Sequence, residues 1–313
     1  GVHLRESGRG ERHKKPGPTS WPHRFRWRPA IGNHPIIWKE SFAGSAKSKL
    51  GIVGYFAILV IAATLLWSML FTFFDSRGGD DYAEYLMIVT PLIGCAMVLW
   101  LAARSAGLVT HEKERDCWMA LLATPLTGKE IVFGKALGNL YAARWGVAFL
   151  ALAWGLGILR SPDLLFAAML MAVALLACAC FGTNLGIFFS LRCNTSTRAM
   201  AQTLAMVLFV GGGYLACCCP LAVTGAGGDG ILIGLAPCMP FLMGVPATLF
   251  FRGAPPEPEI MIAFVFGLVG YSIVAVALLA GAVTDFDLVA GRTAGRPHAR
   301  APQFDDVKLE RID

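Results

Sequence analysis

The chain of 313 residues is 56% hydrophobic and only 15% charged, with a formal net charge of +6 and a mean hydropathy of +0.59. A soluble domain of this size carries more charge, and here the apolar residues come in long blocks, so the composition argues against a soluble protein and indicates an integral membrane protein. The positive charge is concentrated near the ends of the apolar blocks, where membrane orientation explains it, so it gives little support to nucleic-acid binding.

The N-terminal residues 1–31 are basic and rich in Pro and Gly. They contain no apolar core of the kind that a signal peptide needs. We expect this segment to be a basic disordered tail or an inter-domain linker, with the start of a fragment as the other interpretation.

Residues 33–47 have the pattern of a helix that lies on a membrane surface. Pro35 suits the first turn of such a helix, and Trp38 and Phe42 follow on one face at a spacing of four. Lys39 and Glu40 can face water and lipid head groups. The pattern predicts an interfacial helix, with an ordinary juxtamembrane anchor as the alternative.

Six segments are long and apolar enough to cross a bilayer as single helices. They are residues 50–74, 85–103, 137–159, 164–191, 199–223 and 260–284. Residues 230–251 have sufficient length too, but Pro237, Pro240 and Pro246 interrupt them. Repeated prolines favour paired half-helices or a re-entrant segment packed against protein.

The distribution of basic residues decides between six spans and seven. With six spans and an inner N-terminus, every Lys and Arg lies inside except Arg77, Arg160 and Arg252, as the positive-inside rule requires. Seven spans would place all the basic residues after residue 284 outside. We therefore expect six spans, a re-entrant outer segment at 230–251, and both termini on the cytosolic side of the plasma (inner) membrane.

A charged island at residues 111–135 lies between the second and third spans, on the inner side. Thr110 is placed to cap a helix whose first turn holds Glu112 and Glu114, where the helix dipole favours carboxylates. Trp118 then begins a short apolar face. This order of caps and apolar positions favours a docking surface for a soluble partner, with a solvated, merely orienting loop as the alternative.

The second half of the island predicts a break and a new helix. Thr124 and Pro125 end the first helix, because proline disfavours helical geometry in the residue before it. Thr127 and Glu130 have the spacing of a capping box, which starts a helix that runs into the third span. The charged residues of the island are Glu112, Lys113, Glu114, Arg115, Asp116, Lys129, Glu130 and Lys135.

Two parts of this island resemble the first cytosolic loop of ABC-2 type ABC-transporter permeases. The first part is the stretch Glu112-Lys113-Glu114-Arg115. The second part consists of Leu121-Leu122-Ala123-Thr124-Pro125-Leu126 and, after it, Glu130-Ile131-Val132.

Two further stretches support the resemblance, which covers residues 32–293. Asn33-His34-Pro35-Ile36-Ile37-Trp38-Lys39-Glu40 is similar to the family's entry before its first span, although His34 separates Asn from Pro and Lys39 stands where Arg is common. Asp285-Phe286-Asp287 is similar to the family's exit from its last span.

The resemblance implies an all-α transmembrane domain over residues 32–293, followed by a cytosolic tail over 294–313. Such a domain has six spans, an amphipathic elbow helix before the first span, a coupling helix after the second, and a re-entrant outer segment before the sixth. The elbow then corresponds to Pro35, Trp38, Lys39, Glu40 and Phe42. The coupling loop corresponds to Glu112, Lys113, Glu114, Arg115, Asp116, Trp118, Thr124, Pro125, Thr127, Lys129 and Glu130.

In function, the resemblance implies the permease subunit of an ATP-driven exporter. It would form the substrate pathway as a homodimer or with a second permease half, and a separate ATP-binding subunit would engage the 111–135 loop. The alternative is a membrane scaffold or assembly factor that recruits a soluble partner through the same loop without transport. The aliphatic and aromatic spans do not identify a substrate.

Several catalytic sites are excluded by missing motifs. The chain has no G-x-x-x-x-G-K-[ST] phosphate loop, so we expect ATP and Mg²⁺ on the partner and no cofactor in this chain. His111-Glu112 is not followed by the second histidine of a zincin motif, and we expect no metal site. No paired acids or histidine clusters lie at mid-membrane, which weighs against a proton-driven transporter and an intramembrane enzyme.

Four polar residues within the spans are candidates for the substrate pathway, namely Arg144, Asn184, Gln202 and Tyr271. For Arg144 the simpler interpretation is a side chain that extends to the inner interface, and the alternative is a contact with an anionic substrate or lipid. Gly182 and Gly186 form a G-x-x-x-G pattern that allows two helices to approach closely.

The cysteines of the outer side allow one disulfide. Cys217, Cys218 and Cys219 end the fifth span and Cys238 lies in the outer segment, so one of the three could pair with Cys238. Packing by small side chains is the alternative. Metal binding by the triplet is disfavoured, because adjacent helical cysteines do not converge on one ion.

Overall fold

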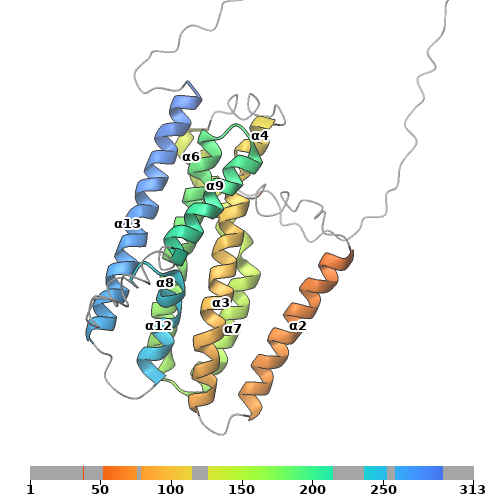
Figure 1. Ribbon diagram of the computed structural model, residues 1–313, viewed down its shortest axis with the longest axis vertical. Coiled ribbons are helices and arrows are strands. Elements are labelled where there is room, and N and C mark those ends of the chain that lie inside the picture. The colour runs from red at the N-terminus through yellow and green to blue at the C-terminus, as the bar shows by residue number, and fades with distance from the viewer. Residues whose placement is uncertain are drawn as a thin grey trace, which may run out of the picture. The chain divides into compact units, whose positions relative to one another are not determined.

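The computed structural model describes Trp38 and residues 52–75, 79–114, 126–213, 236–251 and 258–291. Within these residues every regular element is a helix and no strand is present, which confirms the all-α class (Figure 1). The helices are α2 (Ile52–Asp75), α3 (Gly79–Ala106), α4 (Thr110–Glu114), α6 (Gly128–Ala142), α7 (Arg144–Arg160), α8 (Leu164–Arg192), α9 (Ser196–Leu208), the short π-helix η2 (Phe209–Gly213), α12 (Met239–Phe251) and α13 (Pro258–Val289).

Four helical stretches are long and apolar enough to cross a bilayer. They are Phe56–Asp75, Tyr82–Glu114, Leu164–Arg192 and Pro258–Val289, and the bent pair α6–α7 makes a fifth if it is taken as one span. The four single helices coincide with the first, second, fourth and sixth of the predicted spans, in that order. The bent pair coincides with the third. The fifth predicted span begins with α9 and η2, and its part beyond Gly213 lies outside the described residues.

The third span differs from the single helix predicted over 137–159. α6 starts at Gly128, and α7 departs from its direction by 49° after Ala143. At the bend the amide of Ala143 donates to the carbonyl of Leu140 at 3.0 Å, an i→i−3 bond of the tighter 3₁₀ type. The segment contains no proline, so its apolar composition indicates only that a helix spans here and not that the helix bends.

The prolines of the outer segment interrupt it less than expected. Pro237 lies in a turn, but Pro240 lies in the first turn of α12 and Pro246 lies inside that helix. A proline in a first helical turn removes no intrahelical hydrogen bond, and one inside a membrane helix is tolerated where neighbouring groups satisfy the freed backbone. With 13 residues α12 is a half-helix, too short to cross a bilayer.

The core of the bundle forms around α8, which packs mainly against α3, α12 and α13 (Figure 1). The predicted close approach at the G-x-x-x-G pattern is confirmed. A Cβ atom on Gly186 would lie 2.8 Å from the Ala102 carbonyl oxygen of α3, and one on Gly182 would lie 3.1 Å from Val98. By contrast, α2 is almost entirely exposed and contacts α3 through a 3.2 Å hydrogen bond between Ser68 and Tyr85.

Candidate functional site

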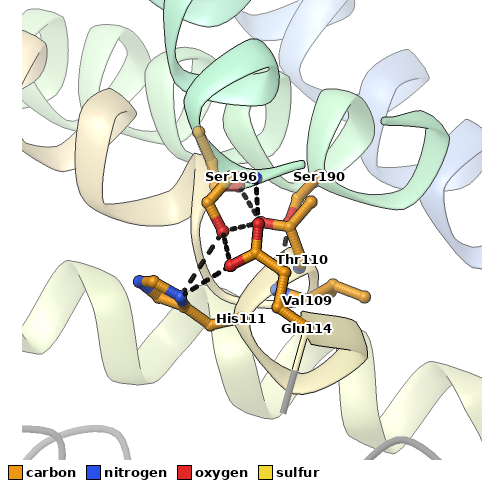
Figure 2. Close-up of polar contacts among 7 residues, drawn as sticks. Val109, Thr110, His111, Glu114, Ser190 and Ser196 are labelled. Carbon is orange, nitrogen blue, oxygen red and sulfur yellow. Dashed lines mark hydrogen bonds and ion pairs between the residues drawn. The ribbon is translucent and has the colours of Figure 1, made fainter. Parts of the chain in front are cut away.

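The first flank of the charged island is the short helix α4, which a turn at residues 107–109 joins to α3. The expected cap at Thr110 is wrong, because its hydroxyl donates backward to the Ala106 carbonyl at 3.0 Å. The amides of Val109 and Thr110 both donate to the hydroxyl oxygen of Ser190 on α8, each at 3.0 Å (Figure 2). Ser190 is fully buried, so α8 holds the turn from α3 into α4 through one polar side chain.

Glu114, at the end of α4, binds the N-terminus of α9. Its carboxylate accepts from the Ser196 amide at 2.6 Å and from the Ser196 hydroxyl at 2.8 Å (Figure 2). The N-cap residue Thr195 makes no side-chain capping bond, so Glu114 satisfies one of the amides that a helix start leaves without an intrahelical partner. These two hydrogen bonds lower the pKa of the Glu114 carboxyl, and His111 beside it acts in the same direction.

Glu112 forms a separate contact with α6. Its carboxylate lies 2.9 Å from the ammonium of Lys135, which also donates to the Leu108 carbonyl at 3.0 Å. Lys135 is only 1% exposed. A buried ammonium is costly unless it is paired, so this contact fixes α6 against the end of α3.

Two further cations make contacts at the C-terminal end of α8, one from α4 and one from α8 itself. Lys113 donates to the Leu191 carbonyl at 2.6 Å, and such contacts satisfy the carbonyls left open at a helix end. Arg192 forms an ion pair of 2.8 Å with Asp285 of α13. The ends of α3–α4, α8 and α13 are therefore held together on one side of the bundle.

The second flank of the island is the start of α6, and the predicted capping box is confirmed. Thr127 accepts from the Glu130 amide at 3.3 Å, and the Glu130 carboxylate accepts from the Thr127 amide at 2.8 Å. These bonds lower the pKa of the Glu130 carboxyl. A Cβ atom on Gly128 would collide with Asp287 and lie 3.0 Å from Phe286, so this glycine allows α6 to start directly against α13.

These contacts define what we name the loop-anchor cluster. Its members are Glu112, Lys113, Glu114, Lys135, Ser190 and Ser196. The cluster ties both sides of residues 115–125 to the neighbouring helix ends. Among the described residues no group of metal-ligating side chains gathers, and the cluster consists of capping and ion-pair contacts.

The structure describes part of the predicted coupling loop and elbow. Glu112, Lys113, Glu114, Thr127, Lys129 and Glu130 are described, whereas Arg115, Asp116, Trp118, Thr124 and Pro125 lie outside the described residues. Of the elbow, Trp38 is described and is helical, and Pro35, Lys39, Glu40 and Phe42 lie outside. The roles of both segments therefore stay predictions.

The four pathway candidates have different hydrogen-bond partners and surroundings. Asn184 is buried and donates to the Ala275 carbonyl of α13 at 2.9 Å, and Tyr271 donates to the Pro237 carbonyl at 2.6 Å. Gln202 is exposed and accepts from the Cys193 thiol at 3.0 Å. Arg144 lies at the bend between α6 and α7. Asn184 and Tyr271 thus connect helices within the bundle, and a substrate contact stays a prediction.

The cysteine prediction is only partly described. Cys238 is a buried free thiol just before α12, while Cys217, Cys218 and Cys219 lie outside the described residues. The disulfide therefore stays a prediction.

Sequence analysis assigned no partner to Lys135 and no role to Ser190 or Ser196. Serines near the ends of apolar helices give no signal of their own. Lys135 could have been found, because it is the single charge between Glu130 and Arg144 in a segment that leads into a membrane span, and such a charge needs a partner.

Comparison with known proteins gives one finding. A family model described as ABC-2 family transporter protein matches residues 54–228, which is more than half of the chain and includes the loop-anchor cluster. Neither the curated proteins nor the solved structures give a match. With its apolar spanning helices, the chain belongs to the ABC-2 family of transporter proteins and is an integral membrane permease.

Proposed function

We propose that the chain is the membrane-spanning subunit of an ATP-driven exporter. It is coupled through the 111–135 loop to a separate ATP-binding subunit, which carries the ATP and Mg²⁺, and it forms the substrate pathway together with a second permease half, as a homodimer or a heteromer. Residues 32–293 are the transmembrane domain, 1–31 a basic tail or linker, and 294–313 a cytosolic tail.

The observation that carries the proposal is the anchoring of both loop flanks. A partner can drive a transporter only if its nucleotide states bind the permease with different free energies, and if the bound segment is connected to the helices that move. Glu114 connects the loop to the start of α9, and the pair of Glu112 and Lys135 connects it to α6. A displacement of the loop therefore acts on two spans at once.

The ion pair between Arg192 and Asp285 supports the six-span arrangement. It places the end of α13 beside the end of α8, so the chain between them crosses the membrane an even number of times. One crossing by the segment that starts with α9 and one by α13 satisfy this condition, with α12 as a re-entrant half-helix. A seventh full span would separate the two charges by the width of the bilayer.

The positive-inside rule assigns the end that holds the loop-anchor cluster to the cytosol of the plasma (inner) membrane. Both termini are then cytosolic, and Trp38 belongs to an elbow helix on the inner surface.

The test is co-purification with the ATP-binding protein encoded beside this chain, followed by an ATPase assay. The variant Glu114→Lys reverses the charge at the start of α9. Its matched control is Glu259→Lys. Glu259 is exposed and lies in the first turn of α13, at the end of that helix opposite to Asp285. We expect E114K to lower the ATPase activity of the complex about fivefold or more, and E259K to leave it unchanged.

Two results would overturn the proposal. The first is that no nucleotide-binding protein co-purifies, and the second is that E114K and E259K give the same ATPase activity. In either case the loop is not the coupling element, and the interpretation as a membrane scaffold is favoured. Gel-filtration profiles of both variants must match the wild type, so that misfolding is not mistaken for uncoupling.

A further inference from the structure

A cavity of about 480 Å³ lies beside the bend of the third span, between α3, α6–α7 and α8. Its volume falls within the range of roughly 300–1,000 Å³ that is usual for ligand pockets. The residues of α6 and α7 that line it follow one helical face. They include Leu140 on α6 and Val147, Leu150, Ala151, Trp154 and Gly155 on α7.

The cavity opens toward the lipid side of the bundle. Val147 on α7 is 46% exposed and Leu176 on α8 is 59% exposed, and both line the cavity. A Cβ atom on Gly155 would meet nothing within 4 Å, so the space in front of this glycine is open. The cavity is thus a groove between α7 and α8 rather than a closed void.

Water is a poor occupant of this groove. A buried water needs two to four polar partners, and the lining side chains are apolar apart from the indole of Trp154. That indole nitrogen donates to the Thr90 hydroxyl at 3.1 Å. An apolar chain is the chemistry that fits.

One end of the groove carries a cation at the depth of an aromatic belt. Arg144 lies four residues after Leu140 and three before Val147, both of which line the groove, so it is their neighbour on the helix surface. Its guanidinium lies 5.0 Å from the ring centre of Tyr141 and 5.8 Å from that of Trp145. Exposed Trp and Tyr mark the membrane interface, so this charge lies near lipid head groups.

We propose that the groove binds one phospholipid with an anionic head group. The phosphate lies at Arg144 and one acyl chain follows α7 past Val147 to Gly155. From Arg144 to Gly155 the helix rises about 16 Å, close to the ~15 Å depth of one leaflet. Moving an acyl chain from the bilayer into the groove changes its free energy little, because the surrounding lipid chains are as apolar as the groove. The groove therefore selects between lipids by the charge of the head group.

The test uses two photoreactive lipids, a phosphatidylglycerol and a phosphatidylcholine, each with a diazirine on one acyl chain. The full chain is reconstituted in nanodiscs, irradiated, and digested to map the adducts on α7 and α8. We expect the anionic lipid to label groove residues about fivefold more than the zwitterionic one, as one basic residue near the surface provides.

Three variants test the assignment. Gly155→Leu fills the groove and should reduce labelling by the anionic lipid several-fold, and Ala151→Leu, an exposed lining position, should do the same. Arg144→Gln should remove the preference for the anionic lipid. Gly270→Leu is the matched control, since a Cβ on Gly270 of α13 also meets nothing within 4 Å and this position does not line the groove; it should leave labelling unchanged.

Equal labelling by both lipids, or a preference that survives R144Q, would overturn the proposal. So would unchanged labelling in both G155L and A151L. A disulfide between two copies of an Ala151→Cys variant would show that a second copy occupies the groove, and would also overturn it. None of these results depends on an ATP-binding partner, so the inference stands or falls separately from the proposed transport function.

Discussion

Two glutamates of the loop-anchor cluster lie two residues apart and serve different helices. Residues at this spacing project about 200° apart around a helix, so Glu112 contacts Lys135 of α6 while Glu114 contacts Ser196 of α9. The sequence predicted that both would act on the dipole of their own helix. Glu112 does lie in the first turn of α4, but each carboxylate also binds a group on another element.

Loss of the buried cation should destabilise the bundle strongly. Lys135→Met leaves the Glu112 carboxylate without its ammonium partner, and breaking a buried ion pair typically costs about 3–5 kcal/mol. We expect a clear drop in the melting temperature of the purified protein. The double variant K135M/E112Q should recover part of the loss, because it removes both charges. If the double variant is less stable than K135M alone, the pair does not determine the stability of this contact.

The carboxylate of Glu114 should make stability depend on pH in the acid range. Its pKa lies below the ordinary value of 4.5 in the folded protein because Ser196 donates to it. A group with a lowered folded pKa stabilises the protein above its unfolded pKa, and this contribution is lost as the pH falls through the folded pKa. We expect E114Q to melt below wild type at neutral pH, and the difference to shrink below pH 4.5. A difference that stays constant into acid would contradict the assigned hydrogen bonds.

At the scale of elements, glycines determine how closely α8 can approach α3. Gly186 lies so close to α3 that a Cβ atom would collide with the Ser105 hydroxyl and lie 2.8 Å from the Ala102 carbonyl. A backbone oxygen cannot move aside as a flexible side chain can. The helix pair therefore depends on the absence of a side chain at this position.

The variant Gly186→Ala should separate α8 from α3. Overpacking of a tight contact costs about 1–3 kcal/mol, and thermal unfolding of the purified protein measures it. Gly155→Ala is the control, since its Cβ meets nothing within 4 Å and alanine favours a helix by up to about 1 kcal/mol over glycine. Equal effects of the two variants would mean that helix propensity, and not the close approach, decides stability.

At the scale of the whole molecule, the two ends of the bundle differ in chemistry. One end holds the loop-anchor cluster and the ion pair of Arg192 and Asp285. Near the other end, Arg160 donates to the Phe73 carbonyl at 2.6 Å. This contact joins the end of α7 to the end of α2.

The sidedness of these ends can be measured with cysteine variants in a cysteine-free background. Lys129→Cys at the start of α6 and Leu288→Cys at the end of α13 are exposed positions on the loop side, and Glu259→Cys lies at the start of α13. We expect an impermeant maleimide to label E259C in intact cells and to label the other two only after permeabilisation. Labelling of K129C and L288C from opposite sides would contradict six spans.

The sequence by itself determined the membrane class, the positions of most spans, the capping box at Thr127 and the family. These features follow from local pattern, because apolar length and capping residues act on neighbouring positions along the chain. The bend after Ala143, the helical place of Pro246 and the partners of Glu112 and Glu114 depended on the tertiary structure. The partners of the two glutamates are decided by contacts between residues far apart in sequence, such as Glu114 with Ser196, and a single sequence does not show which helix faces will meet.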